Sequence, residues 1–147
     1  MPLSQPNDLT AVAEGYRRLG DSTEAVSAFQ FQVIAARRGF AAANKDKVVR
    51  FVRAVADAFR FIRAPANRAE VIKAIVEQTG SSEQIARAVM ALYLEPDRGA
   101  LPRQAEIDLP GLTQVIAFMG EAGTLKAPLP PAERFVDLQY LRAAGIE

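Results

Sequence analysis

Residues 15–62 decide the fold class, and they read GYRRLGDSTEAVSAFQFQVIAARRGFAAANKDKVVRFVRAVADAFRFI. A short strand-like run at 16–19 enters a polar turn, and a second strand-like run follows at 29–35. In the next stretch, apolar residues repeat with the period of an α-helix. They recur at intervals of three, four and seven and form one stripe: Val48, Phe51, Val52, Val55, Phe59 and Ile62. The stretch therefore predicts two strands followed by a long amphipathic helix.

The chain on either side of this stretch carries signals for short helices. Capping residues pair with a Glu or Gln three positions later, glycines stand where helices end, and a proline follows one expected cap. The expected caps and stops are Asp8 with Gly15, Asn44 or Asp46, Asn67 with Glu70, Gly80, Ser81 with Gln84, Asp108 with Pro110, and Asp137. These signals predict five or six helices.

The expected fold is mainly α with one or two short strands, in a single domain over 1–147 with residues 1–7 frayed. Strand edges without partners are a liability for a soluble protein. We therefore expect the chain not to be a plain monomer. Either two copies pair their 29–35 segments or apolar helix faces as a homo-oligomer, or a separate polypeptide completes the sheet.

Composition excludes several classes of function. The net charge is +1, from 18 basic and 17 acidic residues, so no strong field would attract nucleic acid. The chain has no Cys and no His, which removes disulfides, thiolate chemistry, the usual general base and the commonest metal ligand. We expect no enzyme activity, no cofactor and no metal. No apolar run approaches the roughly 18 to 20 residues that span a bilayer.

The order of the segments resembles a known family over residues 8–147. The segments are GYRRLGDS, FQFQVIAARRGFAAAN, VVRFVRAVADAFRFI, PANRAEVIKAIVEQTG, DLPGLTQVIAFMGEAGTL and PLPPAERFVDLQYLRAAG. They resemble the C-terminal part of ABC-importer solute-binding proteins of the NMT1/THI5-like group, which bind nitrate, taurine, sulfonates or pyrimidine precursors. The resemblance implies part of a periplasmic-binding-protein type II α/β fold, which traps a small ligand between two lobes and delivers it to a permease without catalysis.

Relative to that family the chain looks truncated, since the opening strands and much of the second lobe are missing. The resemblance implies a periplasmic protein if the chain is part of an exported one. As written, without a signal peptide, it would stay in the cytoplasm. Whether Met1 is the natural start stays open.

Four polar residues are candidate ligand contacts. Asp21 and Ser22 fall where the resemblance places the passage between lobes, although turn formation alone also explains them. Gln30 and Gln32 bracket Phe31 and could reach a ligand from one strand face, while the solvated face of an edge strand explains them equally. Two functions stay open. One is binding of a small organic anion or a nitrogen or sulfur compound. The other is a helical self-associating or partner-binding module that has lost its ligand.

Overall fold

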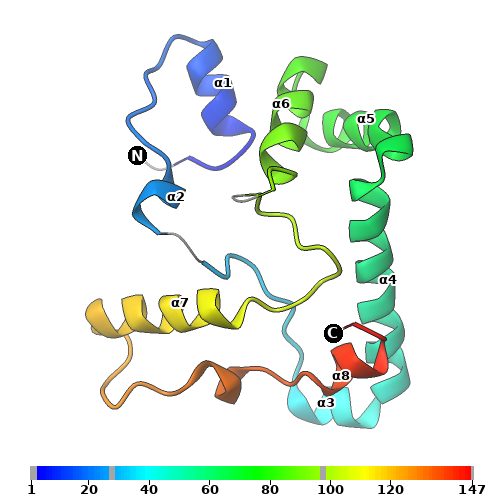
Figure 1. The fold of residues 1–147 in the computed structure, drawn as a ribbon, viewed down its shortest axis with the longest axis vertical. Helices are drawn as coiled ribbons and strands as arrows, with labels where there is room; N and C mark the ends of the chain where they lie inside the picture. Colours follow the sequence, from blue (N-terminus) through cyan, green and yellow to red (C-terminus); the bar gives the residue numbers. More distant parts are fainter. Residues whose placement is uncertain (1–2, 27–28, 97–98, 147) are drawn as a thin grey trace. The chain divides into compact units, whose positions relative to one another are not determined.

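A computed structural model describes residues 3–26, 29–96 and 99–146, and in these ranges the protein is mainly helical (Figure 1). The α-helices are α1 (Asn7–Ala13), α2 (Ser22–Ala25), α3 (Arg38–Ala43), α4 (Lys45–Arg63), α5 (Arg68–Thr79), α6 (Glu83–Tyr93), α7 (Leu109–Glu121) and α8 (Gln139–Ala143). Two 3₁₀ turns are η1 (Pro65–Asn67) and η2 (Ala132–Phe135). The mainly α class predicted from the sequence is confirmed. Residues 1 and 2 of the expected frayed end lie outside the described ranges.

The chain divides into two compact units, and each is described by itself. Unit 1 takes Met1–Glu24 and Ala58–Arg103, and unit 2 takes Ala25–Asp57 and Gln104–Glu147. The division falls inside α4, so this helix contributes its first thirteen residues to unit 2 and its last six to unit 1.

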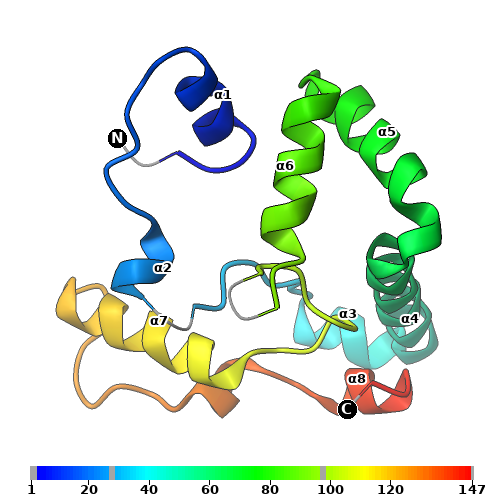
Figure 2. The ribbon, with the colours of Figure 1, turned by 45° about the horizontal axis from the view of Figure 1, so that its top comes forward.

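The core of unit 1 lies between α5 and α6, which are in contact and inclined to one another (Figure 1). Ile72 from α5 and Met90 from α6 are almost fully buried there, and Ala86 is completely buried. A methyl side chain at position 86 keeps the two helices close, as ridge-and-groove packing requires. The partly buried side chains around this core are Ile62, Ile75, Val76 and Leu94. The N-terminal helix α1 also contacts α6 (Figure 2).

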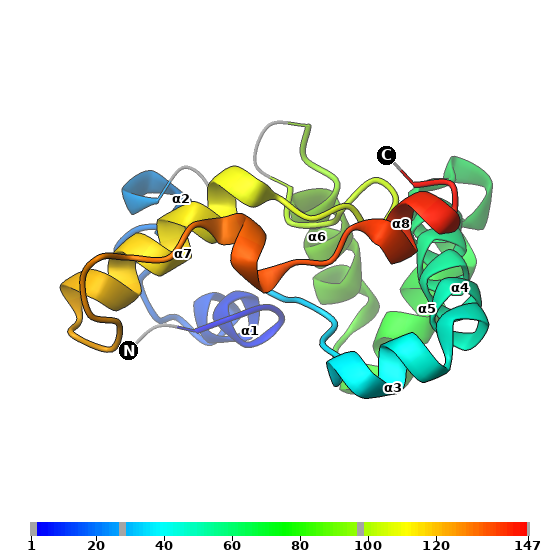
Figure 3. The ribbon, with the colours of Figure 1, turned by 90° about the horizontal axis from the view of Figure 1, so that it is seen from below.

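The core of unit 2 joins the first half of α4 to the C-terminal helix α8, which lies alongside it (Figure 3). Ala56, Ala144 and Ile146 are buried at this contact, and Val49 and Leu141 pack around them. Elsewhere in unit 2, α7 packs against η2. Apolar burial of this kind is the main favourable term in folding, and here it is confined to small clusters.

The two predicted strands are absent: no strand occurs within residues 3–26, 29–96 and 99–146. The run at 16–19 is irregular, and Tyr16 donates its backbone N–H to Ala11 O at 3.0 Å as part of the end of α1. The run at 29–35 is neither helix nor strand and has no ladder beside it. A strand exists only through hydrogen bonds to a neighbour, so a strand-like sequence without a neighbour does not form one.

The helix boundaries match the predicted caps and stop residues in part. Gly80 ends α5 with φ +69°, the left-handed conformation that suits glycine, and Asp108 caps α7 by accepting the Gly111 N–H at 3.0 Å. The capping box at Ser81 is wrong by one residue, because the Ser82 hydroxyl accepts the Ile85 N–H instead.

The caps expected at three other helix starts are not made. Asn67 donates its side-chain amide to Phe61 O and Asn44 donates to Phe40 O, so both amides satisfy carbonyls of the preceding helix rather than capping the next one. Asp46 lies inside the first turn of α4, which begins at Lys45, and Asp8 lies inside α1, which begins at Asn7. The carboxylate of Asp8 therefore does not cap α1 and contacts other residues instead.

Candidate functional site

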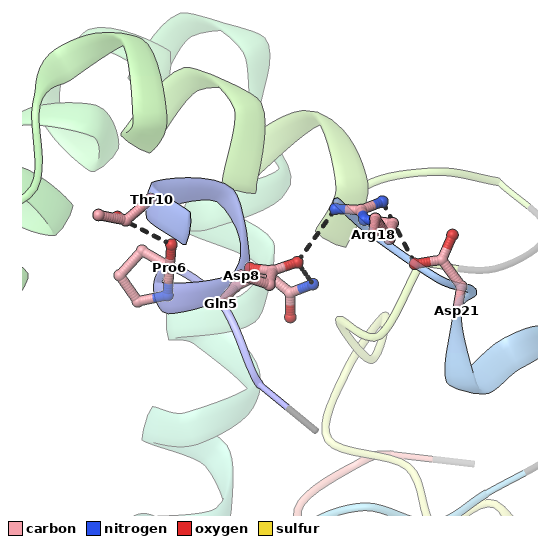
Figure 4. Close-up of polar contacts among 6 residues, drawn as sticks. All are labelled: Gln5, Pro6, Asp8, Thr10, Arg18 and Asp21. Atoms are coloured by element: carbon pink, nitrogen blue, oxygen red, sulfur yellow. Dashed lines mark hydrogen bonds and ion pairs between the residues drawn. The ribbon is translucent and has the colours of Figure 1, made fainter. Parts of the chain in front are cut away.

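Asp21 belongs to an ion-pair cluster in unit 1 that is centred on Arg18 (Figure 4). One guanidinium nitrogen, Nη1, lies 3.2 Å from Asp21 Oδ1, and the other, Nη2, lies 3.2 Å from Asp8 Oδ2. Gln5 Nε2 also donates to Asp8 Oδ2 at 3.1 Å. The Arg18 side chain thus ties the segment after α1 back to that helix. The carboxylate of Asp21 is engaged inside the protein, and sequence reasoning gave no role to Arg18.

Ser22 is the first residue of α2 and is exposed. The preceding carbonyl, Asp21 O, accepts the Glu24 N–H at 3.0 Å, which is the turn chemistry expected of this polar pair. Within the described residues the Ser22 hydroxyl has no hydrogen-bond partner. It is therefore the one predicted contact of this pair that is available to a ligand.

Gln30 holds the run at 29–35 to the start of α7 in unit 2. Its Oε1 accepts the Asp108 backbone N–H at 2.8 Å, and its Nε2 donates to Gln32 O at 2.6 Å. The Gln30 amide is therefore committed to structure at both ends, whereas the Gln32 side chain is exposed.

Gly111 allows this contact, because the backbone approaches too closely for a side chain. A Cβ on Gly111 would lie 2.7 Å from Gln30 N and closer still to the Asp108 carboxylate. Gly111 is buried. The two residues that its Cβ would meet are fixed in place, because Gln30 bonds to Asp108 and Asp108 caps α7. We call this contact among Gln30, Asp108 and Gly111 the α7 latch. It joins residues 78 positions apart, and neither Asp108 nor Gly111 was a predicted site residue.

The most distinctive feature of unit 2 is the irregular run of residues 29–36 (Figure 3), which we call the extended segment after its strand-like sequence. Its large apolar side chains are exposed: Phe29 47%, Phe31 70%, Val33 57% and Ile34 64%. Within the described residues no backbone N–H or C=O of 29–36 bonds to another backbone group. Exposed apolar side chains beside unpaired backbone are the features of a sheet edge that recruits another strand.

A shallow open hollow of about 320 Å³ lies between α5 and α6 in unit 1. Ala69, Ile72 and Val76 supply its apolar lining. The charged lining residues pair along their own helices, with Lys73 Nζ 3.8 Å from Glu77 Oε1 and Arg87 Nη2 2.5 Å from Glu83 Oε1. Exposed pairs of this spacing stabilise a helix weakly. Nothing in the hollow points to a particular ligand.

The predicted contacts are divided between the two units, with Asp21 and Ser22 in unit 1 and Gln30 and Gln32 in unit 2. Only Gln30 and Gln32 are joined by a contact. Across the described part of the chain, no three Asp or Glu carboxylates gather as a metal site would need. In the same residues, no helix is both long and apolar enough to cross a membrane. No protein-family model, curated protein or solved structure matches this sequence.

Proposed function

We propose that this chain is a non-catalytic, solute-binding component of a periplasmic ABC importer system, forming part of a type II binding-protein fold. The extended segment is the observation that carries the proposal. It has the composition of a strand, with β-branched and aromatic residues alternating with Gln, yet within the described residues it makes no backbone–backbone hydrogen bond. In the proposed role this segment belongs to the sheet of a binding protein, in the position that the order of the sequence motifs implies.

The ligand class that follows is a small organic anion or a compound of nitrogen or sulfur. The Ser22 hydroxyl and the exposed Gln32 amide are the predicted contacts still free to donate hydrogen bonds. The other two are already used, since Asp21 pairs with Arg18 and Gln30 with the α7 latch. We therefore assign ligand contact to Ser22 within unit 1 and to Gln32 within unit 2, each taken by itself, and supporting roles to Asp21 and Gln30.

Thermal unfolding with taurine, an alkanesulfonate and nitrate tests this proposal. A ligand at about 100 times its Kd stabilises the folded state by about 2.7 kcal/mol. In a chain of this size that corresponds to a Tm rise of roughly 5 to 10 °C. Ser22→Ala should reduce the rise, whereas Gln84→Ala, an exposed amide in α6, should leave it unchanged. No rise with any of these three solutes would overturn the assignment of solute binding.

Self-association is the second candidate function, and a specific observation favours it. The large side chains of the extended segment are exposed on a chain whose buried clusters are small. Light scattering coupled to size exclusion measures this directly. A discrete mass of twice 15.9 kDa supports a self-associating module, and the monomer mass at every concentration excludes it.

A further inference from the structure

We propose that the first half of α4, together with α3, binds the surface of an anionic lipid bilayer and lies along that surface. The contact is made by one exposed side of α4, which we call the cationic face and define as Lys47, Arg50, Phe51 and Ala54. All four residues belong to unit 2. The inference goes beyond solute binding and self-association and depends on neither.

The cationic face is distinct from the face of α4 that the fold uses. Its members are spaced by three, four and seven residues, so they lie together on one side of the helix. Each of the four is exposed, and Phe51 is 52% exposed. On the other side of the helix, Val49 and Ala56 pack with α8 in the core of unit 2. The helix therefore has one face in the core and a second, cationic face toward solvent.

Positive charge is concentrated around this face. Residues 37–57 hold six basic and two acidic residues, which leaves 12 basic and 15 acidic residues for the rest of the chain. The segment thus carries a net charge of +4 and the rest carries −3. The two acidic residues, Asp46 and Asp57, fall on the same side of the helix as Arg53 and outside the cationic face. Such a local excess attracts an anionic partner, although the chain as a whole is nearly neutral.

The cations of the face are not neutralised within the protein. In the ranges that the structure describes, neither Lys47 nor Arg50 forms an ion pair with a carboxylate. Exposed cations in unit 1 behave differently, since Lys73 and Arg87 each pair with a glutamate one turn away. The charge of the cationic face is therefore available to a partner.

The short helix α3 adds to the same surface (Figure 3). Arg37, Arg38 and Phe40 are exposed, and Phe40 is 54% exposed. Asn44 alone separates α3 from α4. Its backbone N–H and its side-chain amide both donate to Phe40 O, at 2.9 and 3.0 Å. These bonds hold the end of α3 at the start of α4, so cations and an aromatic ring from both helices lie close together.

A bilayer surface fits this mixture of side chains better than other polyanions do. At the edge of a membrane, lysine and arginine reach the headgroups while an aromatic ring enters the acyl boundary below them. Duplex DNA would satisfy the cations by charge but leave Phe40 and Phe51 in water. A groove on an acidic protein would take the apolar stripe of the helix, and that stripe is used by the core.

The expected binding is reversible and sensitive to salt. Clusters of about four to eight Lys and Arg bind anionic leaflets, and each such cation contributes about a fivefold factor in affinity. The unpaired cations of the segment fit this range: Arg37, Arg38, Lys45, Lys47 and Arg50. Loss of two cations should therefore weaken binding roughly 20- to 30-fold.

Sedimentation of the full chain with vesicles tests the proposal. It should bind vesicles of phosphatidylcholine and phosphatidylserine in a ratio of about 7 to 3, not phosphatidylcholine alone, and high salt should release it. Lys47→Gln with Arg50→Gln should show the 20- to 30-fold loss. Lys73→Gln with Arg87→Gln removes the same charge from unit 1 and should have little effect. Absence of binding to anionic vesicles, or equal losses from the two double variants, would overturn the proposal.

A tryptophan reporter tests insertion of the ring, because the chain has no tryptophan of its own. Emission from Phe51→Trp should shift to the blue on anionic vesicles, as the ring leaves water. Phe135→Trp is the matched control, since Phe135 is 56% exposed and lies in η2. Its emission should not shift. Equal shifts at both positions, or none at Phe51→Trp, would contradict insertion. Tighter binding to a single-stranded oligonucleotide than to anionic vesicles would overturn the choice of a bilayer.

Discussion

Phe31→Ala is the substitution that most directly tests the role of the extended segment. Phe31 is 70% exposed, so its removal leaves no cavity and should change the stability of the monomer little. In the self-association proposed above, the ring belongs to the exposed apolar surface that pairing would cover. The same substitution should therefore weaken self-association strongly while the fold is preserved, as judged by circular dichroism.

The expected magnitude follows from exposed area. A phenylalanine of about 200 Å² that is 70% exposed presents about 140 Å² to solvent. If pairing covers half of that on each copy, about 140 Å² of apolar surface per dimer depends on this residue. At about 25 cal/mol per Å², its loss costs about 3.5 kcal/mol, which is more than a hundredfold in the dimer Kd.

Sedimentation equilibrium over a wide concentration range measures this change. Leu19→Ala provides the control, because Leu19 is more exposed than Phe31 yet lies outside the segment. General stickiness of exposed apolar groups would make the two variants equally effective. Equal Kd values for wild type and Phe31→Ala would refute the reasoning, and so would a larger effect from Leu19→Ala.

Three further predictions concern the stability of the fold, each measured by urea unfolding. Asp108→Ala should lower the free energy of unfolding by about 1 kcal/mol because it removes the α7 cap; an unchanged value would contradict the capping role. Gly80→Ala should lower the free energy of unfolding by about 1 kcal/mol because φ at this residue is +69°. Gly39→Ala lies inside α3 with open space at its Cβ, so it should raise the free energy of unfolding by about 0.5–1 kcal/mol. Effects of the same sign would contradict this. Met90→Ala should cost about 2–4 kcal/mol at a 3% exposed site, and Met119→Ala, 37% exposed, less than about 1 kcal/mol; equal costs would place the core elsewhere.

The helices could be predicted because their signals are local. The α4 stripe repeats every three or four residues, and Gly80 and Asp108 act within one turn of the helix they end or begin. The misplaced caps show the limit of such signals. Ser81 and Ser82 are chemically equal candidates, and only the backbone conformation decides that Ser82 is the cap, with φ −66° and ψ 157°. Boundaries are accordingly less predictable than the helices themselves.

The site contacts could not be predicted, because they depend on residues distant in the sequence. Gln30 was predicted as a ligand contact, and its observed partner Asp108 lies 78 positions away in the sequence. Arg18 belongs to no recognisable motif, and its structural role comes from pairing with Asp8 and Asp21 at the same time. Its test is a double substitution, because exposed ion pairs contribute little one at a time.

The wrong strand prediction and the proposed interface have one physical cause. Sequence alternation at 29–35 reports which backbone conformation the side chains favour, and in the structure the segment is neither helix nor strand. Alternation does not report whether hydrogen-bond partners are present, and a strand requires both. An apolar segment with a strand-like sequence that, within the described residues, lacks such partners keeps its backbone groups and side chains available. Whether a second copy or the sheet of a binding protein supplies the second condition, the same residues make the contact, and Phe31 is the most exposed of them.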